Sequence, residues 1–167
     1  MKLMIGLLFL LVAFFTSESE PELEYRKQNF KSYYYLQTDP RWANDKIGGS
    51  EESIASVGCT ICCLAMALST EGYVINPQKL NEQLKKNNGY TKRGWLIWGA
   101  VSKVTKGKFT VVIQNQVSDK EISQLLNGGR TVLAKIKLNG YAYHWVLIVS
   151  KKGKGYYVRD PLEKSSK

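Results

Sequence analysis

The hydrophobic pattern changes its period partway along the chain, and this change limits the fold more than any other feature. Residues 59–70 are rich in Cys, Ile, Leu, Ala and Met and contain neither Gly nor Pro. This run predicts a buried helix that is ended by Gly72. Asn76 and Pro77 then predict the start of a second helix, and residues 95–104 are expected to form a third. The first half of the chain is therefore predicted to be helical.

Strand patterns dominate the second half. The segments rich in β-branched and aromatic residues predict strands at residues 109–113, 131–137, 143–150 and 156–159. Ser118 and Glu121 have the spacing of a capping box, which predicts a short helix between the first two strands. Asn139-Gly140 and Gly153-Lys154-Gly155 are turn sequences between the later strands. Together these patterns predict an α+β domain, with N-terminal helices packed on a C-terminal antiparallel sheet.

The N-terminus has the pattern of a targeting segment. Lys2 precedes residues 4–15, an uncharged apolar run that is shorter than the ~20 residues needed to span a bilayer. Such a run predicts the core of a secretory signal, and the small residues Ser17 and Ser19 predict cleavage after Ser19. The alternative is an uncleaved membrane anchor.

The expected domain organisation follows from this signal. We expect a signal peptide over residues 1–19, a polar lead-in over residues 20–32 and a single domain over residues 33–167. The signal predicts a secreted protein. No second apolar stretch is long enough to span a membrane, so no stable membrane span is expected.

The chain is basic, with 24 Lys and Arg residues against 14 Asp and Glu and a net charge of +10. This balance favours an acidic surface or partner, although a solvated basic surface explains it equally simply. No nucleic-acid-binding motif accompanies the charge, so nucleic acid is not an expected partner. A monomer is expected.

All three cysteines lie within residues 59–63. Small secreted proteins often carry an even set of cysteines in disulfides. An odd set so close together cannot link distant elements, and at least one thiol stays free unless it pairs between molecules. Cys62 and Cys63 fall inside the predicted helix, so both are expected to be core thiols. A free thiol kept in an oxidising compartment suggests a catalytic use.

The only histidine, His144, lies near the start of a predicted strand, and Asp160 lies at the end of the next one. Counting back from a turn near Gly153 places His144 opposite residue 161 or 162, within one cross-strand neighbour of Asp160. A carboxylate beside an imidazole can fix its tautomer and stabilise its protonated form.

Cys59 lies at the predicted start of the buried helix, directly after Gly58. A helix N-terminus lowers the pKa of a thiol, because the backbone N–H groups and the helix dipole favour the thiolate. A protonated histidine nearby lowers it further, and such thiols reach pKa values of roughly 3.5–7.5. The thiolate is the nucleophilic form, so this placement favours nucleophilic catalysis.

Sequence blocks in this order resemble a known family. The blocks are Tyr35–Trp42, Val57–Thr60 with Leu64–Leu68, Leu126–Gly129, Tyr143–Val149 and Tyr157–Pro161. Their order and spacing resemble the papain-like cysteine peptidases related to the bacteriocin-leader (double-glycine) peptidases. The resemblance covers about residues 33–161 and implies a papain-like fold.

The resemblance also implies roles for four residues. Cys59 is the nucleophile, His144 is the base that later protonates the leaving amine, and Asp160 orients His144. Gln37 corresponds to the residue whose amide stabilises the oxyanion, together with the backbone N–H of Cys59. The expected function is that of a secreted cysteine-dependent amide hydrolase acting on a peptide or a peptide-containing polymer, without metal or organic cofactor.

Several alternatives stay open. One alternative to catalysis is that Cys59 forms a disulfide with Cys62 or is an inert buried thiol. Zinc could bind Cys59, Cys62 and His144, although no fourth ligand is evident. The tryptophans, including Trp95 and Trp145, are expected in the core or in a cleft wall. The alternative function is a catalytically inactive secreted module of the same fold that binds an acidic surface or partner.

Overall fold

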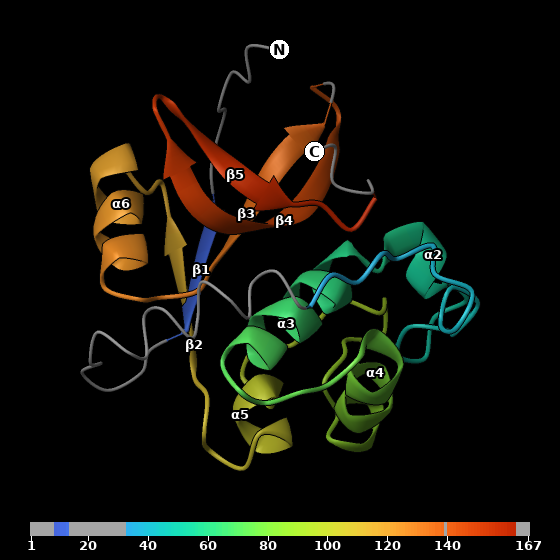
Figure 1. The fold of residues 1–167 in the computed structure, drawn as a ribbon. Helices are drawn as coiled ribbons and strands as arrows, with labels where there is room; N and C mark the ends of the chain where they lie inside the picture. The colour runs from blue at the N-terminus through green and yellow to red at the C-terminus, as the bar shows by residue number, and fades with distance from the viewer. Residues whose placement is uncertain (1–8, 14–32, 139, 163–167) are drawn as a thin grey trace.

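A computed structural model describes residues 9–13, 33–138 and 140–162. The helices are α2 (Ile54–Val57), α3 (Cys59–Thr70), α4 (Pro77–Lys86), α5 (Ala100–Val104) and α6 (Asp119–Asn127). The strands are β1 (Phe9–Ala13), β2 (Val111–Asn115), β3 (Val132–Leu138), β4 (Ala142–Lys152) and β5 (Gly155–Arg159). The predicted separation of helices from later strands is confirmed, because α2 to α5 precede β2 to β5 (Figure 1).

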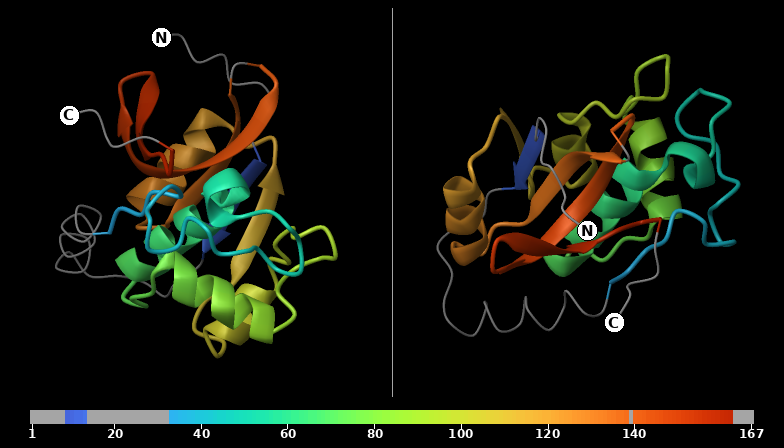
Figure 2. Two further views of the ribbon diagram at one scale, coloured as in Figure 1. Left: turned by 90° about the vertical axis from the view of Figure 1, so that its right-hand side faces the viewer. Right: turned by 90° about the horizontal axis from the view of Figure 1, so that it is seen from above.

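One sheet contains the five strands in the order β2-β1-β3-β4-β5, and every neighbouring pair is antiparallel. Helices α3, α4 and α5 form a layer against the sheet, and α6 stands apart from them beside it (Figure 1 and Figure 2). The architecture is therefore α+β, as the sequence predicts.

Apolar side chains cover both faces of β3 and β4, because successive strand residues point to opposite sides. Leu133 and Leu147 join the large core around α3. Val132 and Val146, one position away on the same strands, join a smaller core with Ile122 of α6. Strands β3 and β4 are thus held between two apolar layers.

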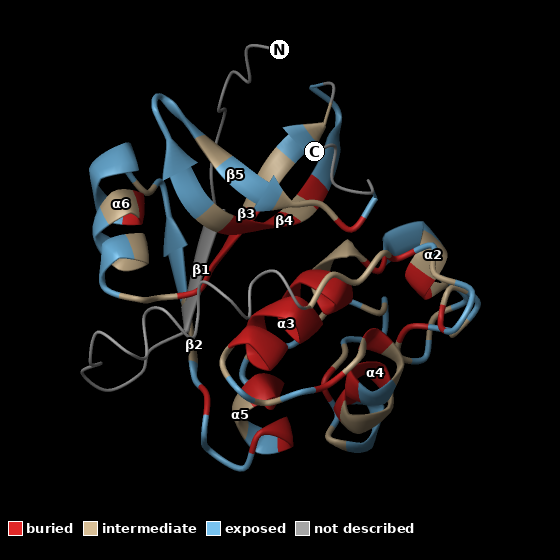
Figure 3. Cartoon of the chain, viewed as in Figure 1, coloured by how far each residue is buried: buried red, intermediate tan, exposed pale blue. Residues whose placement is uncertain are grey.

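Helix α3 is the centre of the larger core. It spans Cys59–Thr70, which confirms the predicted helix, and each residue from Ile61 to Thr70 is buried (Figure 3). A helix that is apolar all round belongs inside a protein, because no polar face is available for solvent. Only its first turn reaches the surface, so this turn is the part of α3 that a ligand can approach.

The predicted helix over residues 95–104 is wrong in its first half. Helix α5 covers only Ala100–Val104. The preceding segment folds back on itself, because the Thr91 N–H donates to the Trp95 carbonyl and the Ile97 N–H donates to the Gly89 carbonyl, each at 2.8 Å. These bonds commit the backbone of residues 89–97 to a loop, which we call the Trp95 loop.

The N-terminal segment is described only at β1, which lies between β2 and β3. The expected cleavage site after Ser19 and the lead-in at residues 20–32 lie outside the described residues. Residues 9–13 of the predicted signal peptide form β1, so cleavage after Ser19 would remove this strand from the sheet, and the signal peptide stays a prediction. Within the described ranges, no helix is both long and apolar enough to cross a membrane.

Candidate active site

Cys59 is the first residue of α3, and Gly58 separates that helix from α2. A Cβ atom added at Gly58 would lie only 2.6 Å from Ile54 Cγ2, so a larger residue does not fit without movement of the chain. Glycine fits at this junction because Ile54 of α2 fills the space where a Cβ atom would lie. This junction fixes the direction in which the Cys59 side chain leaves the helix.

His144 and Asp160 come from β4 and the end of β5. These strands pair with Leu147 opposite Arg159, and continuing that register places Asp160 opposite Val146, two residues from His144. The side chains meet, with His144 Nε2 2.6 Å from Asp160 Oδ1. The proximity that turn counting predicts is therefore present in the structure.

Asp160 is itself held in place by backbone contacts. The Leu162 N–H donates to Asp160 Oδ1 at 2.8 Å, and the Tyr34 hydroxyl donates to the Asp160 carbonyl at 2.7 Å. Burial raises the pKa of the Asp160 carboxyl, but the hydrogen bonds from His144 and from the Leu162 N–H outweigh it and lower the pKa. The carboxylate stays ionised and faces the imidazole. Sequence reasoning did not find Tyr34, since a tyrosine before a turn carries no distinctive pattern.

Cys59 and His144 form the second contact of the site. Burial raises the pKa of the Cys59 thiol, but hydrogen bonds with His144 and with the Trp145 backbone outweigh burial, so the pKa lies below its ordinary value. Burial lowers the pKa of His144, but its hydrogen bonds with Asp160 and Cys59 raise it to about 9. A lowered thiol pKa beside a raised imidazole pKa favours a thiolate–imidazolium pair at neutral pH.

The two ring nitrogens of His144 have different partners. Nε2 is engaged by Asp160, so Nδ1 is the nitrogen left for Cys59. His144 is only 3% exposed, whereas Cys59 is partly exposed. Solvent and substrate therefore approach the sulfur, while the base behind it is shielded from water.

Gln37 lies beside α2, where it contacts Ala55, one helical turn before Cys59. Its side chain is buried, and Nε2 donates to the Ala55 carbonyl at 2.6 Å. The Gln37 N–H donates to the Pro161 carbonyl at 2.9 Å, which ties this residue to the segment that carries Asp160. An amide nitrogen carries two hydrogens, so one remains for a further acceptor. Among the described backbone hydrogen bonds, none uses the Cys59 N–H as donor.

Cys62 and Cys63 are fully buried, as predicted for core thiols. Burial raises the pKa of both thiols, so neither is ionised at neutral pH. The Cys63 thiol donates to the Trp145 carbonyl at 3.3 Å, which joins α3 to β4. All three cysteines are free thiols. In the part of the chain that the structure describes, no group of three or more His, Cys, Asp or Glu residues could hold a metal ion.

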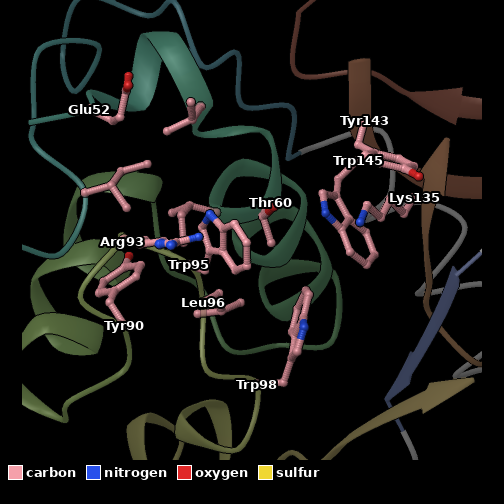
Figure 4. A pocket seen from close by; sticks show the side chains of 14 residues that line it. Glu52, Thr60, Tyr90, Arg93, Trp95, Leu96, Trp98, Lys135, Tyr143 and Trp145 are labelled. Carbon is pink, nitrogen blue, oxygen red and sulfur yellow. The ribbon is translucent and has the colours of Figure 1, made fainter. Parts of the chain in front are cut away.

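A cleft of about 590 Å³ adjoins the Cys59–His144 pair. Thr60 lines it directly after Cys59, and Tyr143 and Trp145 line it on either side of His144. The Trp95 loop forms the opposite wall (Figure 4). The tryptophans are expected in the core or in a cleft wall, and both places are occupied. Trp42 is buried in the core, whereas Trp95 and Trp145 line the cleft.

Comparisons with known proteins give one match. No curated protein and no solved structure matches the chain. The Peptidase_C39 like family matches residues 27–167, a range that contains Gln37, Cys59, His144 and Asp160. The match covers most of the chain and agrees with the α+β fold of helices packed on an antiparallel sheet. The chain therefore belongs to the Peptidase_C39 like family of papain-like cysteine peptidases.

Proposed function

We propose that this protein is a peptide hydrolase in which Cys59 is the nucleophile, His144 the acid and base, and Asp160 the residue that positions His144. One observation carries the proposal. The only histidine of the chain bonds Asp160 at 2.6 Å through Nε2 and lies near enough to Cys59, at the start of α3, for each residue to shift the pKa of the other. This arrangement provides an activated sulfur and a proton donor within one contact.

The first half of the reaction forms a thioester. The Cys59 thiolate attacks the carbonyl carbon of the scissile amide, and the carbonyl oxygen becomes an oxyanion. The Cys59 N–H and the second hydrogen of Gln37 Nε2 are the candidate donors to that oxygen. His144 then gives its proton to the amide nitrogen, the C–N bond breaks, and the amine leaves.

The second half regenerates the thiol. Neutral His144 takes a proton from a water molecule, which attacks the thioester carbonyl. The C–S bond breaks, the carboxylic acid leaves, and the Cys59 thiolate again faces protonated His144. Asp160 keeps its negative charge throughout and stabilises the imidazolium in both halves. No cofactor takes part in these steps.

The test is the pH dependence of Cys59 alkylation in the full chain, followed by mass spectrometry. We expect fast labelling of Cys59 well below pH 8, because its pKa is lowered by His144. The His144→Ala variant should label slowly or only at higher pH. Cys62 and Cys63 serve as internal controls and should label only in denaturant. Labelling of Cys59 with an ordinary thiol pKa of about 8.5 would contradict the proposal.

A second candidate function rests on the net charge of +10. The same fold without catalysis could bind an acidic surface or partner. Salt-sensitive binding of the Cys59→Ala variant to a polyanion, together with an unreactive Cys59 in the parent, would favour this function. We also propose export, because residues 1–19 have the pattern of a secretory signal.

A further inference from the structure

The cleft beside Cys59 lies where a substrate side chain near the scissile bond must go. Its lining includes the residue after Cys59 and both neighbours of His144, namely Thr60, Tyr143 and Trp145. A side chain close to a carbonyl carbon at the sulfur is therefore within reach of this cleft. Figure 4 shows the side chains of Trp95, Trp98 and Trp145 around it.

The walls of the cleft are aromatic and partly open to water. The ring centroids of Trp98 and Trp145 lie 5.2 Å apart in an edge-to-face contact, so these two rings support one another. Trp95 is 67% exposed, although it is the largest apolar side chain of its loop. Covering such rings with an apolar group is favourable, at roughly 25 cal/mol per Å² of buried apolar surface.

The size of the cleft indicates that a large side chain would fill it better than a small one. A volume of about 590 Å³ lies within the ~300–1,000 Å³ typical of ligand pockets. A glycine carries no side chain to fill it, so a Gly-Gly sequence would leave the rings of Trp95 and Trp145 in water. A bulky aromatic or aliphatic side chain would contact both walls.

Charged side chains at the cleft add a second requirement. The Arg93 guanidinium lies 5.9 Å from the centroid of the Trp95 ring, and Lys135 Nζ lies 4.0 Å from that of Tyr143. Glu52 is the one acidic residue of the lining, and its Oε2 accepts a hydrogen bond from the Ser56 hydroxyl. Two cations against one carboxylate favour an acidic neighbour beside the apolar group of the substrate.

We propose that this cleft is the specificity site of the peptidase and takes a bulky aromatic or aliphatic substrate residue, with Asp or Glu beside it. The occupant is expected within two residues of the scissile bond, since the lining includes Thr60, next to Cys59, and Trp145, next to His144. The part of this inference that is tested by cleavage rests on the proposed function. Binding to the cleft can be measured without cleavage.

The first experiment digests a mixed peptide library with the full chain and identifies the cut sites by mass spectrometry, with Cys59→Ala as blank. We expect enrichment of Phe, Tyr, Trp or Leu at one position within two residues of the cut, next to Asp or Glu. Trp95→Ala should lower kcat/KM for such peptides by about 10-fold or more. Arg93→Gln should remove the acidic preference while the aromatic preference stays.

The control variant is Tyr141→Ala, which removes an aromatic side chain that is 90% exposed and outside the cleft lining. It should leave the cleavage pattern unchanged. Cleavage without side-chain preference, or a Gly-Gly preference that Trp95→Ala does not alter, would overturn the inference and leave the proposed function intact.

A second measurement does not need activity. The Cys59→Ala variant is titrated with N-acetyl-Asp-Phe-amide and with N-acetyl-Gly-Gly-amide, and tryptophan fluorescence reports binding. We expect tighter binding of the Asp-Phe probe by about 10-fold, lost when Trp95→Ala is added. Equal affinity for both probes would overturn the cleft assignment, even if the parent cleaves no peptide.

Discussion

The three cysteines of α3 lie within five residues and have opposite environments. Cys59 is partly exposed at the first turn, hydrogen-bonds His144 and has a lowered thiol pKa. Cys62 and Cys63 are fully buried one turn further along, and burial raises their pKa values. The same side chain is therefore a nucleophile or a core-filling group according to where the helix emerges from the core. Environment, rather than residue type, separates the two roles.

The strongest test of this comparison is the loss of each thiol in turn. Cys59→Ala should lower hydrolysis of any responsive peptide by a factor on the order of 10⁴–10⁶, because the nucleophile is lost. Cys62→Ala should keep activity within a few-fold, since that thiol only fills the core. Rates with a fluorogenic peptide check both. Comparable losses of activity in the two variants would contradict the assignment of Cys59 as nucleophile and Cys62 as a core thiol.

Asp160→Asn removes the charge that faces His144 without changing the size of the side chain. We expect turnover to fall by as much as about 10⁴-fold, because the imidazolium loses its stabilising carboxylate. Alkylation of Cys59 should also slow below pH 8, because a smaller fraction of His144 is protonated and a smaller fraction of Cys59 is therefore ionised. The matched control is Asp119→Asn, which breaks an exposed pair with Lys151 at the start of α6. If both variants had equal activity, Asp160 would have no role in positioning His144.

Gln37→Ala tests the proposed oxyanion donor separately from the thiolate. Loss of one such donor typically lowers turnover by about 10²–10³. Alkylation of Cys59 should keep its rate and pH profile, because Gln37 is not among the groups that set the thiol pKa. Circular dichroism melting should accompany the assay, since Gln37 is buried and bonded to Pro161. Slower alkylation in step with turnover would show a general distortion instead.

The smallest expected effect is on the pH dependence of stability. Above both the lowered Cys59 pKa and the ordinary His pKa of 6.5, and up to about pH 9, the folded pair holds one proton on His144, and the unfolded chain holds one on Cys59. The folded and unfolded states bind the same number of protons, so the pair does not make the free energy of unfolding depend on pH in this range.

Cys59→Ala upsets this balance. The folded variant loses the Cys59 interactions that raise the His144 pKa, while the hydrogen bond from Asp160, which raises it, and burial, which lowers it, both remain. A raised folded pKa gives stability that is present below pH 6.5 and is lost as the pH rises toward the folded value. To the extent that Asp160 keeps the imidazole pKa above 6.5, thermal melting should show the variant losing stability above pH 6.5, over a range that ends below 9, by at most about 1.4 kcal/mol per pH unit. A parallel decline in the parent would argue against a thiolate–imidazolium pair.

Much of the site could be predicted from sequence because its contacts are set by local patterns. The apolar run without Gly or Pro gives the bounds of α3, and a short turn between β4 and β5 brings Asp160 to His144. Both relations depend on residues close together in the chain. The order of the strands and the position of β1 depend on pairing over long distances, which composition does not encode.

The cleft wall could not be predicted for a related reason. Residues 95–104 have apolar positions that suit a helix, but the Gly89 carbonyl accepts the Ile97 N–H and turns the segment into a loop. That loop holds Trp95 at the cleft, where it is exposed rather than packed. Clustered aromatic residues occur both on the buried face of a helix and in the wall of a cleft, so the sequence alone does not tell these two structures apart.

The bonds between the two ends of the domain have a consequence for biosynthesis. Tyr34 and Gln37 bond the backbone of Asp160 and Pro161, which the ribosome adds more than a hundred residues later. Until residue 162 has left the ribosome, Cys59 has neither His144 nor Asp160 in place. The growing chain therefore lacks the arrangement of Cys59, His144 and Asp160 until these last residues have been added.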